Sequence, residues 1–451
     1  MKEIDFTTGK ILPKLIRFAL PILAALLLQA MYGAVDLKIV GEYSSTADLS
    51  AVSIASQIMH TITGILVGLS TGVSVIVAKK IGEARPDDAG KVIGAGIVLF
   101  GIVAVIATAV FVLTARPIAD LMLTPEEAFE STVSYLKICS GGIVFILAFN
   151  VLGGVFRGIG DSKMPLITVA IACVVNILGD LLLVKTFNMG AAGAAYATVF
   201  AQAVSVFLSL IIIRRRKLPF EFSRRDIRFD PVINRGILKL GVPIALQDML
   251  VSLSFLVITA IINDLGLIKS AGVGVAEKLC AFVMLIPSAY SQSMAAVVGQ
   301  NIGAMRPDRA RKALWCGIGT SLCAGVIIGY FSFFHGDILA GIFSDDEAVI
   351  VQAASYLKSY AIDCLFTSFL FCFIGYFCGL GSTVFVMIQG LVGAFCVRIP
   401  VSYFVSRIPD VELFYIGLAT PSSTIVQIAL CLVYFVVVNR KFRKTDIQSI
   451  N

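Results

Sequence analysis

Long apolar segments alternate with short polar ones along almost the whole chain. A helix needs about 20 apolar residues to cross a bilayer, and on this scale the pattern predicts about twelve membrane-spanning helices. The segments are too long for the strands of a membrane barrel, and they lack its alternation of apolar and polar positions. The predicted spans are residues 15–40, 51–78, 92–114, 134–156, 164–186, 190–213, 237–263, 270–299, 313–334, 355–378, 384–406 and 413–438.

The composition agrees with this pattern. Hydrophobic residues make up 58% of the 451 residues and charged residues only 14%, with a mean hydropathy of +0.93. An average soluble domain carries about 25% charged residues. A soluble protein could not hide this much apolar surface from water, so we expect an all-α polytopic protein of the cell membrane.

The basic residues predict the orientation of the chain. If the N-terminus lies inside, most of the 36 Lys and Arg residues fall in cytoplasmic segments, as the positive-inside rule requires. We therefore expect both termini in the cytoplasm. The net charge of +7 is scattered among apolar stretches, which excludes a nucleic-acid binding face. The basic run within residues 214–235 is a topology determinant that also fits contact with anionic membrane lipid.

The two halves of the chain resemble each other. Residues 70–97 align without gaps on residues 291–318, with 11 identities in 28 positions. The same offset of 221 pairs two further short motifs, and an offset of 222 pairs Pro21 with Pro243. Each half holds six predicted spans, so both halves share one orientation and are related by a pseudo-twofold axis along the membrane normal. The sequence thus predicts two six-helix bundles: an N-lobe (1–213), a cytoplasmic basic linker (214–235) and a C-lobe (236–451).

Polar residues inside the predicted spans of the first half are candidates for function. An ionised carboxylate at mid-membrane raises the free energy of insertion by about 2.5–3.5 kcal/mol. A carboxylate at that depth is therefore a candidate for a functional role. Asp36 ends the first span and Asp180 lies in the fifth, four residues after Asn176 and therefore on the same helix face. Together with Asn150 and Thr198, these side chains predict an oxygen-rich cluster within the first bundle.

The alternative is that each polar group is merely paired across a helix interface. The second half provides a control, because at offset 221 Asn176 and Asp180 correspond to Val397 and Val401. A purely architectural pair should recur in both halves, and this one does not. The asymmetry favours function.

The second half has its own polar residues within spans, notably Gln247, Asp363 and Arg398. Asp363 with Arg398 fits a structural ion pair and a substrate role equally well. His60 either faces a central cavity or is a satisfied buried histidine. The three glycines Gly64, Gly68 and Gly72 predict close helix packing, and Pro21 makes the first span a bending element.

Enzyme chemistry finds no support in the sequence. The ten cysteines form no CxxC pair and have no nearby histidine, which favours small buried hydrophobes over a metal site. No HExxH motif occurs. We expect no enzyme activity, no cofactor and no metal beyond a sodium ion at the Asp36/Asp180 cluster.

The arrangement resembles the multidrug and toxic compound extrusion (MATE) family of cation-coupled exporters over essentially the whole chain. Pro21, Gln29 and Asp36 resemble the bending first helix of that family with its acidic residue. Asn150, Asn176, Asp180 and Thr198 fall where its N-lobe cation cluster would place them. The loop motif Gly-x-x-Arg-Pro-Asp occurs in both halves.

The resemblance implies an antiporter that exports amphipathic, often cationic drugs in exchange for H+ or Na+ by alternating access. Its expected partners are such small molecules and membrane lipid, and we expect a monomer. The cation site would use Asp36, Asp180, Asn176, Asn150 and Thr198. Some members carry a C-lobe glutamate where this chain has Val251, which shifts the expected ion site to the N-lobe. The alternative function is a flippase for a lipid-linked oligosaccharide or other lipid. Candidates for the substrate cavity or its gating are Gln29, Pro21, Tyr32, His60, Gln247 and Asp363.

Overall fold

The computed structural model describes residues 3–215, 219–220 and 222–448, and all regular structure in this part of the chain is helical. Eleven of its helices are long and apolar enough to cross a membrane. The number is twelve if α5 (Glu126–Gly141) and α6 (Ile143–Gly158), bent by 52°, count as one span. The prediction of an all-α protein with about twelve spans is therefore confirmed. Residues 216–218 and 221 of the predicted linker lie outside the described residues.

The chain divides into two compact units. The first unit contains residues 3–5 and Leu20–Ala245, and the second contains Phe6–Ala19 and residues 246–448. Two helices, α1 (Ile11–Tyr43) and α9 (Pro231–Asn263), each begin in one unit and continue in the other. Both contain an internal proline close to that change, Pro21 in α1 and Pro243 in α9.

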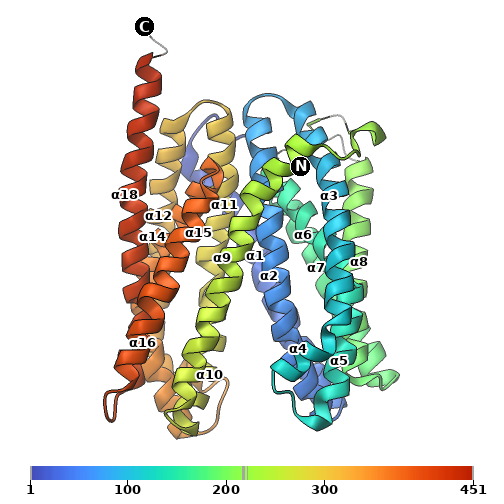
Figure 1. Ribbon diagram of the computed structural model, residues 1–451, viewed down its shortest axis with the longest axis vertical. Helices are drawn as coiled ribbons and strands as arrows, with labels where there is room; N and C mark the ends of the chain where they lie inside the picture. Colours follow the sequence, from blue (N-terminus) through green and yellow to red (C-terminus); the bar gives the residue numbers. More distant parts are fainter. Residues whose placement is uncertain (1–2, 216–218, 221, 449–451) are drawn as a thin grey trace. The chain divides into compact units, whose positions relative to one another are not determined.

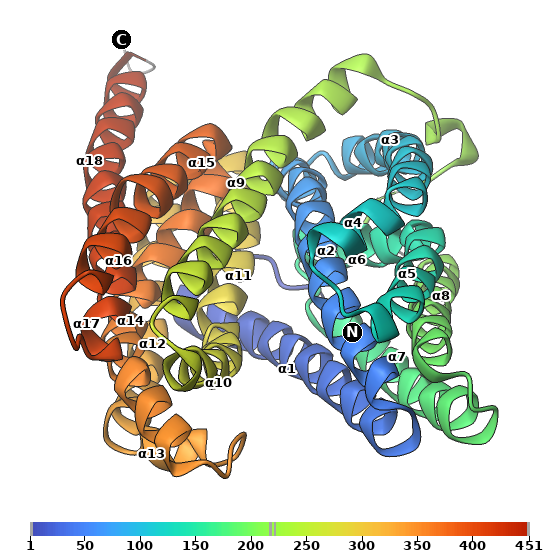
Figure 2. The same cartoon turned by 60° about the horizontal axis from the view of Figure 1, so that its bottom comes forward.

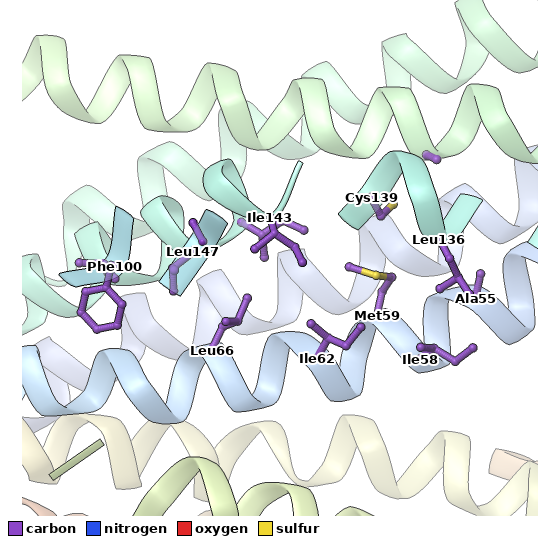
Figure 3. Packing of buried hydrophobic residues seen from close by; sticks show 14 of the residues in the cluster. Ala55, Ile58, Met59, Ile62, Leu66, Phe100, Leu136, Cys139, Ile143 and Leu147 are labelled. Carbon is purple, nitrogen blue, oxygen red and sulfur yellow. The ribbon is translucent and has the colours of Figure 1, made fainter. Parts of the chain in front are cut away.

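In the first unit, α2 (Thr46–Gly82) packs against α3, α5, α6 and α8 (Figures 1 and 2). Figure 3 shows a row of its side chains, including Ile58, Ile62 and Leu66, facing Leu136 of α5 and Leu147 of α6. Burial of these side chains forms the core of the unit. The remaining elements of this unit are α3 (Pro86–Leu113), α4 (Ala115–Leu121), α7 (Lys163–Asp180), η1 (Leu181–Thr186), α8 (Gly190–Arg215) and η2 (Arg224–Asp226).

In the second unit, α14 (Glu347–Leu380) packs against α10, α11, α12 and α18 (Figure 2). Its buried aromatic residues include Tyr356, Phe373 and Phe377. The other elements are α10 (Leu267–Val283), α11 (Leu285–Gly303), α12 (Pro307–Phe334), α13 (Gly336–Ala340), α15 (Thr383–Leu391), η3 (Val392–Arg398), α16 (Ile399–Ser406), α17 (Leu413–Gly417) and α18 (Ala419–Gln448).

The backbone repeats in detail between the units. An added Cβ at Gly158 would lie 2.8 Å from the carbonyl oxygen of Ser74, and one at Gly379 would lie 2.8 Å from that of Ala295. Both the glycines and their partners are 221 residues apart in sequence. Two helices in each unit therefore approach so closely that neither crossing has room for a side chain.

The predicted glycine packing on α2 holds at two of its three positions. A Cβ at Gly68 would lie 2.6 Å from the Cα of Ala245, and one at Gly72 would collide with the carbonyl oxygen of Ile237. Gly64 has nothing within 4 Å of its added Cβ. Gly68 and Gly72 thus allow α2 to approach α9, whereas Gly64 does not take part.

The outer faces of several helices are strongly apolar. In the most apolar 18-residue stretch of α3, the mean hydropathy is 2.9, yet only 22% of the residues are buried within the protein. Val105 and Leu113 expose 71% and 79% of their surface. Such surface would be unfavourable in water and is favourable against acyl chains, so the chain is an integral membrane protein.

Candidate functional site

Two carboxyl groups of the first unit face each other inside the helix bundle. Asp36 lies on α1 and Asp180 is the last residue of α7, and only 6% and 0% of their surfaces are exposed. The two side chains lie within hydrogen-bonding reach of each other. Two carboxyl groups can form such a bond only when a proton lies between them, so their contact favours a shared proton or a bound cation.

The backbone of α7 widens directly after Asp180. The π-helix η1 continues the helix at this point, so the span is not broken. Single π-helical turns within α-helices often occur at functional sites, because the extra residue redirects the neighbouring side chains. The sequence predicted one uniform helix over 164–186, and no motif in it indicated the wider turns.

Asn176 lies one turn before Asp180 and is 1% exposed. Its side-chain amide donates a hydrogen bond of 3.4 Å to the hydroxyl of Thr198 on α8. The spacing of four residues predicted that Asn176 and Asp180 share a helix face, and both are buried in the structure. The structure therefore brings together residues from α1, α7 and α8.

The cluster is rich in oxygen atoms that accept no hydrogen bond from an N–H or O–H donor. Within the described chain these are Oδ1 of Asp36, both carboxyl oxygens of Asp180 and Oδ1 of Asn176. Buried acceptors without donors are rare, and each one needs an explanation. Hard cations prefer oxygen ligands, and a proton would satisfy a carboxylate directly.

Two tyrosines complete the surroundings of the carboxyl pair. Tyr32 on α1 lies near Asp36, Gln29 and Gln202. Tyr135 on α5 is 3% exposed and lies near Asp36 and Thr198. Sequence analysis did not select Tyr135 or Gln202. The available signal for Tyr135 was its place in the repeated motif Ser-Tyr-Leu-Lys.

Three other residues that the sequence predicted for the site make no hydrogen bond with this cluster in the described part of the chain: Asn150, Pro21 and His60. The side-chain amide of Asn150 donates to the carbonyl of Ile146, one turn earlier on α6, at 2.8 Å. Pro21 lies within α1 at partial burial. The His60 side chain on α2 is exposed.

The second unit buries a different set of polar groups. Asp363 on α14 is 1% exposed, and Arg398 at the end of η3 is 7% exposed. Among the residues that the structure describes, the two form no ion pair, so the structural ion pair considered from the sequence is wrong. The Arg398 guanidinium instead lies 4.5 Å from the centre of the Phe255 ring and 3.4 Å from the hydroxyl of Ser254.

Several atoms of this second cluster also have no partner in the described part of the chain. They include Oδ1 of Asp363 and Nε of Arg398, and elsewhere in this unit Oε1 of Gln247. The Thr424 hydroxyl of α18 and the charge of Arg398 lie near the Asp363 carboxyl. Gln247 packs against Gly390, where an added Cβ would lie 3.0 Å from its side chain. This cluster is mixed in charge, whereas that of the first unit is purely acidic.

Neither cluster forms a metal centre of the usual kind. Over the described ranges, no group of three or more His, Cys, Asp or Glu residues could hold a metal ion. Six of the ten cysteines are buried, including Cys139 and Cys364, and two, Cys323 and Cys396, are exposed. The prediction of buried cysteines therefore holds for only part of the set.

Comparison with known proteins places this arrangement in context. The sequence model of the family described as MatE matches residues 21–182 and 243–404. The chain is 27% identical over 401 residues to the probable multidrug resistance protein YpnP of Bacillus subtilis, covering 89% of each protein. It is 24% identical to the multidrug export protein MepA of Staphylococcus saprophyticus, covering 86% of each.

Solved structures show the same fold. An outward-facing multidrug resistance MATE family transporter has a TM-score of 0.92 at 19% identity, covering 98% of this chain and 99% of that one. A transporter from Pyrococcus furiosus, described as having a binding pocket of reverse polarity, has a TM-score of 0.91 at 19% identity, with 98% coverage of both chains.

Proposed function

Because the chain belongs to the MatE family, we propose that it is a secondary antiporter that exports amphipathic, often cationic small molecules in exchange for H+ or Na+. The proposal is supported by relatives named for multidrug resistance or multidrug export. The observation that carries it is the buried contact between Asp36 and Asp180. A carrier needs a group that exists in a loaded and an unloaded state, and a carboxyl pair offers both.

The proposed chemistry follows from charge. When unloaded, two buried carboxylates repel each other and attract a cation. A proton or sodium ion removes one negative charge and allows the pair to close. Asn176 and Thr198 add neutral oxygens next to the pair, which suits a small cation that has lost its water. Loading also lowers the attraction of the site for an organic cation, which links ion entry to drug release.

Coupling further requires two conformations. We propose that the two halves rock about the membrane-embedded sites by alternating access and that α1 bends near Pro21, where the proline removes one helical hydrogen bond. Inward movement of one positive charge across 100 mV supplies about 2.3 kcal/mol. Gln29, Tyr32, His60, Gln247 and Asp363 are proposed to line or gate the substrate path, in a monomer with cytoplasmic termini.

The test compares ethidium efflux from cells that express Asp36→Asn, Asp180→Asn or the wild type at matched protein levels. We expect both variants to lose efflux. Asp264→Asn is the control, because it removes an exposed carboxylate at a helix end and should change nothing. Undiminished efflux by both cluster variants would remove the pair from the mechanism.

A second measurement identifies the ion. Ethidium added to purified wild-type protein should release protons, detected with a pH dye in weak buffer, or sodium, detected with a sodium electrode. The Asp180→Asn protein should release less of the same ion. A flippase would instead need basic groups to hold a lipid phosphate, and the buried charges of the first unit are acidic.

A further inference from the structure

A groove opens on the second unit between the first turn of α1 and the first turns of α12. Its volume is about 570 Å³, and Lys10, Leu12, Pro13, Lys312 and Trp315 are among the residues that line it. Its floor is apolar, while its two lysines come from segments about 300 residues apart in sequence. The groove therefore combines an apolar floor with two cationic side chains.

Neither lysine is neutralised by the protein. In the part of the chain that the structure describes, the ammonium groups of Lys10 and Lys312 make no ion pair or hydrogen bond. The neighbouring carboxylate of Asp308 is occupied by Arg311. Two exposed, unpaired ammonium groups beside one groove leave a positive charge for an external anion.

The wall of the groove that carries Lys10 is fixed in place. One nitrogen of the Arg309 guanidinium donates to the carbonyls of Phe6, Thr8 and Gly9 at 3.0, 2.9 and 3.0 Å. Arg306 donates to the carbonyl of Thr7 at 2.6 Å. Lys10 thus follows directly from an anchored segment, so its backbone position beside the groove is preorganised.

Trp315 gives the groove the character of a membrane interface. It is 50% exposed, and its ring packs edge-on against Phe435 at 6.1 Å and Phe373 at 6.5 Å. Tryptophan prefers the boundary between acyl chains and headgroups. Leu12, on the opposite wall, is 42% exposed. The exposed side chains of Trp315 and Leu12 can therefore pack against the acyl chain of a lipid.

We propose that this groove is a binding site for an anionic phospholipid. Its acyl chain lies on the apolar floor against Trp315 and Leu12, and its phosphate and headgroup lie between Lys10 and Lys312. Free phosphate would leave the floor uncovered, and a zwitterionic lipid would gain less from the two unpaired lysines. The site is independent of the proposed antiport and does not involve the acidic cluster.

The chain contains one tryptophan, Trp315, so its fluorescence reports directly on the groove. The full-length protein is reconstituted in bilayers with increasing fractions of brominated phosphatidylglycerol or brominated phosphatidylcholine, whose bromine atoms quench a contacting indole. We expect half-maximal quenching at a fraction of brominated phosphatidylglycerol about 10-fold lower than that of brominated phosphatidylcholine. Inorganic phosphate should not reverse the quenching.

The double variant Lys10→Gln/Lys312→Gln should lose this preference while still being quenched by both lipids. The matched control Lys163→Gln/Arg440→Gln also removes two exposed basic residues, but neither lines the groove, so the preference should remain. Equal quenching of the wild type by both lipids would overturn the proposal, and so would a preference that survives in the lysine variant. Quenching by neither lipid would show that the groove is closed to lipid and would overturn it as well.

Discussion

Both units contain π-helical turns within a continuous membrane helix, yet the charged side chains beside these turns have opposite signs. In the first unit, η1 follows Asp180, which faces a second carboxyl group. In the second unit, η3 ends at Arg398, which lies over an aromatic ring. At offset 221, residues 181–186 correspond to 402–407, so the two π-helices do not occupy equivalent turns. The two units share a repeated scaffold, but their polar sites lie at different turns of it.

The difference in charge indicates that the two clusters have different functions. The first has unsatisfied acceptors and no basic group from the residues that form it, which suits reversible binding of a cation. The second already contains a fixed cation beside its carboxyl group. We therefore expect ion coupling to depend on the first cluster and to be largely independent of the second.

The largest effect should separate Asp180 from Asp363. We expect Asp180→Asn to lower ion-driven drug uptake into inverted proteoliposomes by about 100-fold, because it removes half of the carboxyl pair. Asp363→Asn changes the same atoms at a buried position of the other unit and should lower uptake by less than about 3-fold. Equal losses in both variants would show that the two clusters act as one coupling site.

The two clusters should also differ in the sign of a stability effect. Arg398→Gln removes the cation near Asp363 and should lower the free energy of unfolding by about 2 kcal/mol. Asp180→Asn relieves repulsion between like groups and should raise the thermal midpoint of the ion-free protein by about 2 °C. Thermal unfolding in detergent, without sodium and at alkaline pH, measures both. A stabilising Arg398→Gln would contradict the assignment of charge in the second unit.

The shared scaffold should respond equally in both units. A leucine at Gly158 or at Gly379 would meet a backbone carbonyl 2.8 Å from its Cβ, so each substitution should cost about 1.5 kcal/mol. Gly64→Leu is the control, because its Cβ would meet nothing within 4 Å. Thermal midpoints of the three variants test this, and a cost in only one unit would show that the crossings are not equivalent.

The smallest effect concerns the shape of the basic group. Arg398→Lys keeps the charge but loses the planar guanidinium over Phe255, for an expected loss of about 1 kcal/mol in stability. Phe255→Leu should cause a similar loss, and the double variant should add little to either. Fully additive losses in this cycle would mean that the stacking contributes nothing.

The sequence predicted the fold well because its main signals are local. Spans follow from apolar length, and the glycine spacing predicted the close helix packing that Gly68 and Gly72 provide. The spacing of Asn176 and Asp180 predicted a shared face, since helix geometry is fixed.

What could not be predicted depends on contacts between distant segments. Tyr135 joins the cluster only because α5 packs beside it, and Gln202 only through Tyr32 of another helix. The missing ion pair of Arg398 depends on a few ångströms of helix position and on an aromatic ring that offered an alternative partner. The π-helical turns cost little energy and have no sequence signature.

The division of α1 near Pro21 has a consequence for biosynthesis. Residues 6–19 are synthesised before residues 20–245, yet they pack within a unit whose other residues, 246–448, are made after those. Residues 6–19 therefore stay exposed to lipid or to chaperones until α11 and α12 have been inserted. If the chain were expressed as two fragments divided in the linker, each fragment would lack a segment of one unit. We therefore expect neither fragment to fold completely without the other.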